Sequence, residues 1–140
     1  MIARATRPEE IAPLLHFKDD AEKYFPCDRG QWIQWLVGAI NSEDVFVAIE
    51  TKQEKIKSYF VVANTVEPPI CDYVNIIYAY CTNPVSIATF AKLIIEWSLS
   101  KNAKRVVWWT AIDAVAPVSD WNETNKFQRI ANVWQYILEK

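Results

Sequence analysis

Cysteine and histidine commonly act as catalytic nucleophiles, general bases and zinc ligands, and this sequence contains few of them. Cys27, Cys71 and Cys81 are odd in number and far apart, which fits neither a secreted disulfide framework nor the paired spacing of a zinc site. His16 is the only histidine. We therefore expect no metal site and interpret the cysteines as reduced packing residues, with a Cys–His nucleophilic pair as the open alternative.

Glycine, the residue that most phosphate-binding loops require, is almost absent. Gly30 and Gly38 are the only two, and none follows Gly38. Sites that hold a phosphate or pyrophosphate usually need glycine, because the backbone must adopt positive φ and approach the ligand without an intervening Cβ. The sequence therefore predicts that a conventional glycine-rich phosphate loop is missing.

The composition indicates one globular domain spanning residues 1–140. With 51% hydrophobic and 14% aromatic residues the chain can bury a substantial core, and it is too short for two ordinary domains. The 15 basic and 17 acidic residues give a net charge of −2, which argues against a nucleic-acid partner. No stretch approaches the roughly 20 apolar residues of a membrane span, and no signal-peptide core is present. We expect a cytoplasmic protein with no membrane partner.

The N-terminal part of the chain predicts a strand followed by two helices. Residues 2–6 alternate with a period of two, as an edge strand does. Thr6 and Glu9 resemble a capping box, which predicts a helix over residues 7–15. A second helix over residues 28–41 is indicated by apolar residues at three- and four-residue spacing, namely Trp32, Ile33, Leu36, Val37 and Ile40.

The remainder predicts a three-stranded meander and then alternating helices and strands. Three runs rich in β-branched and aromatic residues suggest antiparallel strands. A mostly buried helix should then lead, by a crossover, into a central strand that is paired on both sides. The expected elements are strands 45–50, 56–66 and 73–81, helix 85–101, strand 105–112, helix 120–129 and strand 133–138.

This order of elements resembles the GNAT superfamily of acetyl-CoA-dependent N-acyltransferases over essentially the whole chain. Residues 2–10 look like the first strand and turn of that family, and residues 45–50 followed by 56–62 are similar to the hairpin in the middle of its sheet. Residues 127–132 stand where the family usually has Tyr, two polar residues, an apolar residue, Gly and Phe. The resemblance implies an α+β fold with a mixed central sheet flanked by helices; an unrelated α+β domain is the alternative.

The resemblance also implies where a cofactor would bind. In the family, a loop with a Gln or Arg and glycines presents backbone amides to the CoA pyrophosphate at a helix N-terminus. The matching residues, 83–91, contain neither glycine nor a basic residue, and Pro84 removes one amide donor. The side chains of Val85 and Ile87 are expected to compete with phosphate oxygens for space. If acetyl-CoA binds, the expected contact residues are Tyr80, Cys81, Ser86, Ile87 and Ala88.

The catalytic groups of the family are matched only in part. Phe127 stands where many members have a tyrosine that protonates the CoA thiolate, so this role would pass to another acid. The candidates are Tyr80, Cys81 and Tyr136. Asp113, at the end of the predicted central strand, is the best placed base among Asp72, Asp113, Asp120 and Glu123. The alternative for these carboxylates is a solvated loop position, and for Tyr78 and Tyr80 a packing role.

Two functional hypotheses follow. In the first, the domain has lost catalysis, binds no cofactor, and serves as a protein-binding or assembly module, extended to a phage-encoded protein in a virion or host cytoplasm. The missing glycine, basic residue and tyrosine favour it, as do seven tryptophans, since aromatic residues are enriched at interfaces with protein partners or other copies of a chain. In the second, an active N-acetyltransferase holds acetyl-CoA through the helix end near Ser86, aided by Lys92 or Arg129.

Overall fold

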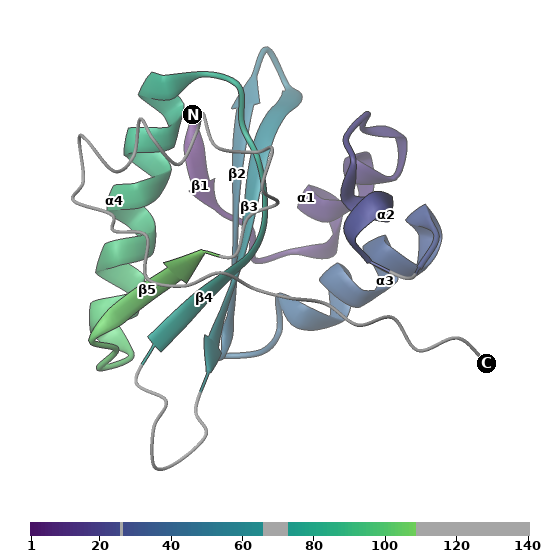
Figure 1. Cartoon of the computed structure of the whole chain (residues 1–140). Coiled ribbons are helices and arrows are strands. Elements are labelled where there is room, and N and C mark those ends of the chain that lie inside the picture. The colour runs from purple at the N-terminus through teal and green to yellow at the C-terminus, as the bar shows by residue number, and fades with distance from the viewer. Residues whose placement is uncertain (26, 66–72, 109–140) are drawn as a thin grey trace.

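The computed structural model describes residues 1–25, 27–65 and 73–108 and has the predicted α+β architecture (Figure 1). A single five-stranded mixed sheet in the order β1-β2-β3-β4-β5 carries helices on both faces. The elements are β1 Ile2–Arg4, α1 Pro8–Ile11, a 3₁₀ helix Ala12–His16, α2 Ala21–Tyr24, α3 Arg29–Ala39, β2 Val45–Lys52, β3 Lys55–Thr65, β4 Tyr73–Tyr80, α4 Pro84–Ser100 and β5 Arg105–Trp108.

The strand pairing confirms the predicted meander and crossover. β1 to β4 pair antiparallel in sequence order, with β1 at the edge, and β5 joins β4 in parallel after α4. The crossover has this form because two parallel strands cannot be joined by a tight turn. The predicted helix 120–129 and strand 133–138 lie outside the described residues. The second neighbouring strand that was expected for strand 105–112 is therefore not described either.

Each face of the sheet packs against its own hydrophobic cluster. One cluster lies between the sheet and the N-terminal helices α1 to α3, and the other lies beneath α4 (Figure 1). α4 buries Ile87, Phe90, Ala91, Ile94 and Trp97, as its spacing predicts. Ile95 and Leu99 are nevertheless 38% and 65% exposed, so α4 is less buried than the sequence suggested.

The N-terminal helices differ from the prediction in two respects. The expected helix 7–15 divides into α1 and the 3₁₀ helix, because Pro13 supplies no amide for an α-helical hydrogen bond. The Thr6 side chain does not cap it; instead the Thr6 amide donates to Glu10 Oε1 at 3.3 Å. The short helix α2 was not predicted. α3 is confirmed, and its capping box is formed by Asp28 and Gln31.

The turn between β2 and β3 is tighter than the loop expected over residues 51–55. Two residues, Gln53 and Glu54, connect the strands, with φ values of 54° and 65°. Positive φ at both central positions is the geometry of a type I′ hairpin turn, which favours Asn-Gly. A side chain with a Cβ costs roughly 1–2 kcal/mol in this region. The hairpin therefore retains local strain that a glycine-poor sequence does not relieve.

We predict that the double substitution Gln53→Asn, Glu54→Gly raises the free energy of unfolding by about 1 kcal/mol, because both residues accept positive φ more readily. Urea unfolding followed by tryptophan fluorescence measures the change. The control Glu54→Ala retains a Cβ at positive φ and should not be stabilised. A lower urea midpoint for the double variant than for the parent chain would contradict the expected turn geometry.

Candidate active site at the end of β4

A β-bulge divides β4 just before its C-terminal half. Val61 pairs with Tyr78 and Val62 with Ile76, so Ile77 is an extra residue without a direct partner on β3. A bulge bends a strand and changes the direction of the side chains that follow it. Pairing with β5 is described up to Ile76–Trp108, which places the bulge next to the last described pair.

Tyr80 is the tyrosine after the bulge whose hydroxyl is available for chemistry. Tyr78 and Tyr80 both pack with the cluster under α1 to α3. The Tyr78 hydroxyl donates to Asp20 Oδ1 at 2.7 Å, and its pKa is raised by burial and by that carboxylate. Tyr80 is half-buried, its ring lies edge-on to Phe17 at 5.3 Å, and its hydroxyl has no hydrogen-bond partner among the described residues.

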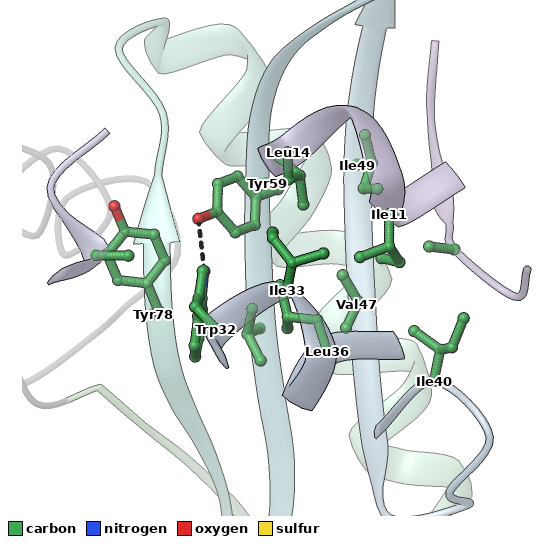
Figure 2. Packing of buried hydrophobic residues seen from close by; sticks show 13 residues of the cluster. Ile11, Leu14, Trp32, Ile33, Leu36, Ile40, Val47, Ile49, Tyr59 and Tyr78 are labelled. Carbon is green, nitrogen blue, oxygen red and sulfur yellow. Dashed lines mark hydrogen bonds between the residues drawn. The ribbon is translucent and has the colours of Figure 1, made fainter. Parts of the chain in front are cut away.

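Tyr59 is the centre of a buried hydrogen-bond network on the same face. Its hydroxyl accepts from Trp32 Nε1 at 3.1 Å (Figure 2). The same hydroxyl donates to Asp19 Oδ2 at 2.7 Å. Burial and the neighbouring carboxylate raise the pKa of Tyr59, so this phenol stays protonated. Trp32 in turn stacks on Phe25 with ring centroids 4.7 Å apart. The network attaches α3 to β3 beneath the tyrosines of β4.

The Asp19 carboxylate is fully buried and is held by several donors. Arg29 binds it through two nitrogens at 2.7 and 3.2 Å, and the Ala21 amide donates at 2.9 Å. Burial alone would raise the pKa of Asp19, but the hydrogen bonds from Arg29, Tyr59 and Ala21 hold it below the ordinary value. The same contact raises the pKa of Arg29. Asp19 is therefore charged and compensated.

Asp20 is a carboxylate of a different kind. It is half-buried and accepts the Tyr78 hydroxyl, and in the described part of the chain it forms no ion pair. Its charge is therefore not compensated as that of Asp19 is. A partly buried anion of this kind attracts a cationic ligand. The sequence analysis did not single out either aspartate, because both lie in a polar stretch that resembled a loop.

Of the two side chains expected to obstruct a phosphate at the first turn of α4, only Val85 remains at the helix end. Asn83 caps the helix, and its side chain accepts from the Val85 amide at 3.0 Å. Ile87 is only 4% exposed and packs in the core beneath α4, so its side chain points away from the helix end. Val85 is 75% exposed there. The Ser86 amide has no acceptor among the described residues, and it remains the available donor in this turn.

Beneath that turn lies a polar cluster that the sequence analysis missed. Glu50 accepts from Ser86 Oγ at 2.6 Å and from Ser58 Oγ at 2.8 Å, and both serines are buried. Burial raises the pKa of the adjacent Cys81, whose thiol donates to the Asn83 carbonyl at 3.5 Å. Cys81 is thus a protonated thiol and a poor nucleophile. The sequence did offer one signal of this cluster, because Glu50 is a charged residue directly after the apolar run 45–49.

The other predicted site residues are not brought into this arrangement by the described structure. Ala88 is exposed on α4, one turn beyond the helix start. His16 is exposed at the end of the 3₁₀ helix, and Cys27 packs against the α1–α3 cluster. Outside the described residues lie Cys71, Asp72, Asp113, Asp120, Glu123, Phe127, Arg129 and Tyr136. No cluster suited to a metal ion, and no helix able to cross a membrane, occurs in the part of the chain that is described.

Solved structures with the same architecture identify the fold. An aminoglycoside 6′-N-acetyltransferase, AAC(6′)-Ih of Acinetobacter baumannii, matches with a TM-score of 0.71 at 9% identity, covering 100% of this chain and 98% of that one. The fold is that of the GNAT acetyltransferases. A GNAT family acetyltransferase of Staphylococcus aureus matches with a TM-score of 0.65 at 14% identity, covering 100% and 98%.

A third GNAT-fold structure holds a ligand. AAC(6′)-Iy, solved in complex with the bisubstrate analogue CoA-S-monomethyl-acetylneamine, has a TM-score of 0.70 at 10% identity and covers 100% of this chain and 98% of its own. No family model matches the sequence, and no curated protein matches it significantly. The similarity therefore establishes the GNAT fold, and the local geometry must carry the argument about function.

We predict that Asp19→Asn lowers the free energy of unfolding at pH 7 by about 3 kcal/mol, because Arg29 and Tyr59 lose a buried charged partner. The folded-state pKa of Asp19 lies below its ordinary value of 3.8, so its stabilisation is complete above about pH 4 and is lost as the pH falls through the folded pKa. Urea unfolding between pH 2.5 and 7 should therefore show a steeper acid decline for the parent chain than for the variant.

The matched control for this prediction is Glu22→Gln, which removes the more exposed partner of Arg29. A partly exposed pair of this kind is worth less than about 1 kcal/mol. If both variants lost the same free energy, the buried aspartate would not be the principal anchor of the network.

Proposed function

We propose that this chain is an N-acetyltransferase that transfers the acetyl group of acetyl-CoA to an amine. The single observation that carries the proposal is the junction of β4 and α4. There a bulged strand presents Tyr80 and then leads, within three residues, to a helix start whose Ser86 amide has no acceptor among the described residues. A structure with the same fold has been solved with a CoA-containing analogue, which supports CoA as the cofactor; the position at this junction follows from the resemblance to the GNAT superfamily. This favours the active-enzyme hypothesis over loss of catalysis.

The chemistry needs no metal and no covalent enzyme intermediate. The amine nitrogen attacks the thioester carbonyl carbon, the carbon–sulfur bond breaks, and the CoA thiolate leaves. The thiolate must then take up a proton, and the amine must lose one to water or to a base. Tyr80 is the described acid best suited to protonate the sulfur, because its hydroxyl is not engaged by a carboxylate as those of Tyr59 and Tyr78 are.

Asp20 supports an amine as the acyl acceptor. Its carboxylate lies on the same face of the sheet as Tyr80 and carries a charge that no described cation neutralises. A protonated amine would be attracted to this position before it loses its proton and reacts. One matched structure is an aminoglycoside 6′-N-acetyltransferase, and another holds a bisubstrate analogue that contains acetylneamine.

The direct test is calorimetric titration with acetyl-CoA, followed by an assay of CoA thiol release in the presence of amines. We expect saturable micromolar binding and amine-dependent thiol release. Asp20→Asn should slow release with a cationic amine more than with a neutral one. The absence of binding and of thiol release with every amine would overturn the proposal.

That outcome would favour the protein-binding or assembly hypothesis instead. Its remaining support in the described residues is Trp35, which is 46% exposed and stacks on Trp32. Trp32 and Trp97 are buried at 4% and 7% exposure, so they do not contribute to a surface. One exposed ring is weaker support than the β4–α4 junction, and a protein partner therefore stays an untested prediction.

We predict that Tyr80→Phe lowers kcat about 100-fold with little change in the KM for acetyl-CoA, because it removes the proposed acid without altering cofactor contacts. Its free energy of unfolding should change by less than about 0.5 kcal/mol, since the Tyr80 hydroxyl forms no hydrogen bond with another described residue. Steady-state kinetics and urea unfolding measure the two effects.

Tyr78→Phe is the matched control, two residues earlier on the same strand. It loses the hydrogen bond to Asp20, so it should be destabilised by about 1 kcal/mol and yet keep kcat within a few-fold. Full kcat in Tyr80→Phe would assign the proton donor to another group.

A further inference from the structure

Glu50 places a carboxylate at the helix end where the proposed cofactor phosphates would bind. It reaches from β2 to the first turn of α4, 36 residues away in sequence, and its two oxygens accept from Ser58 and Ser86. The contact to the Ser86 hydroxyl is 2.6 Å long, and the amide of the same residue has no acceptor in the described part of the chain. Glu50 itself is half-buried and also lines a surface pocket of about 300 Å³.

The Glu50 carboxylate is expected to stabilise the helix and to weaken the binding of an anion at the same helix end. The N-terminus of a helix carries a partial positive charge, so an anion held there stabilises the helix. A diphosphate would use the same positive end and the same turn. Because Glu50 contacts Ser86 directly, a phosphate bound at the Ser86 amide would lie within a few ångströms of a like charge, where screening by water is incomplete.

We propose that Glu50 is a built-in counter-anion of α4 that stabilises the folded chain and at the same time weakens the binding of the acetyl-CoA diphosphate. The inference rests on the proposed function and assigns a residue that sets the affinity of that site for its cofactor. In this proposal Glu50 tunes the site by its charge and takes no part in catalysis.

The decisive variant is Glu50→Gln, which keeps the shape of the side chain. Serine hydroxyls can donate or accept, so both hydrogen bonds can persist while the charge is lost. The control is Glu96→Gln, which makes the same change in net charge on the exposed side of α4, ten residues beyond Ser86 and about 15 Å along the helix. Ser86→Ala is a second variant, since it keeps the amide and releases the carboxylate from the helix end.

Isothermal titration with acetyl-CoA and urea unfolding are run on all four proteins. We expect Glu50→Gln to bind acetyl-CoA about fivefold to tenfold more tightly than the parent while unfolding at a lower urea concentration. Ser86→Ala should move both quantities in the same directions by smaller amounts, and Glu96→Gln should change neither. A purely structural role would weaken binding and stability together.

The outcomes separate this inference from the proposed function. If the parent chain binds acetyl-CoA and Glu50→Gln binds equally or less tightly, the counter-anion role is overturned and the proposed function stands. If only Glu50→Gln binds, the counter-anion role is supported and the activity proposed for the parent chain is overturned. If no variant binds, both are overturned, because α4 then holds no diphosphate whatever charge lies beside it.

Discussion

The buried Asp19 carboxylate is the contact on which the arrangement of the N-terminal helices depends. It lies in the segment before α2, binds Arg29 at the start of α3, and accepts the hydroxyl of Tyr59 on β3. Three elements are thereby fixed to one another by charge-assisted hydrogen bonds at a buried carboxylate. Figure 2 shows the consequence for packing, since Trp32 of α3 reaches Tyr59 alongside Tyr78 of β4.

The scarcity of glycine has visible structural consequences at other positions. Over residues 1–25, 27–65 and 73–108 the residues with positive φ are Gln53, Glu54 and Asn102, and neither glycine has positive φ. Asn102 follows the end of α4, where the Ala103 amide donates to the Ser98 carbonyl in a pattern typical of helix ends. Asparagine tolerates this conformation better than most residues, whereas glutamine and glutamate do not. Residues other than glycine therefore adopt the positive φ values that glycine favours, and this causes some local backbone strain.

The elements predicted best from the sequence were those with strong periodicity. The meander 45–81, the helix 85–101 and the helix 28–41 follow from the spacing of their apolar residues, and that spacing also predicts which faces are buried. The division at Pro13 and the short α2 were missed, because four-residue helices depend on tertiary contacts such as those of Asp19.

The candidate site was predictable only in part. Tyr80 could be identified from alternation along its strand and from the resemblance to acetyltransferases. The bulge at Ile77 could not be predicted. Both strands are rich in β-branched residues there, and such a composition does not indicate which residue is left without a partner across the strand pair. Glu50, Ser58 and Ser86 are distant in sequence and meet only when β2, β3 and α4 are assembled.

The loss of a glycine-rich loop and the loss of cofactor binding are separate questions in this fold. Phosphate oxygens bind to amide hydrogens, and glycine matters because it permits several amides to converge without steric obstruction. At the start of α4, Ile87 turns into the core and the Ser86 amide has no acceptor among the described residues, so one amide remains for the proposed phosphate contact. The more important limit is electrostatic, since Glu50 already occupies the positive end of the helix. The affinity for the proposed cofactor should therefore depend on the charge of Glu50, which lies outside the loop that motif comparisons examine.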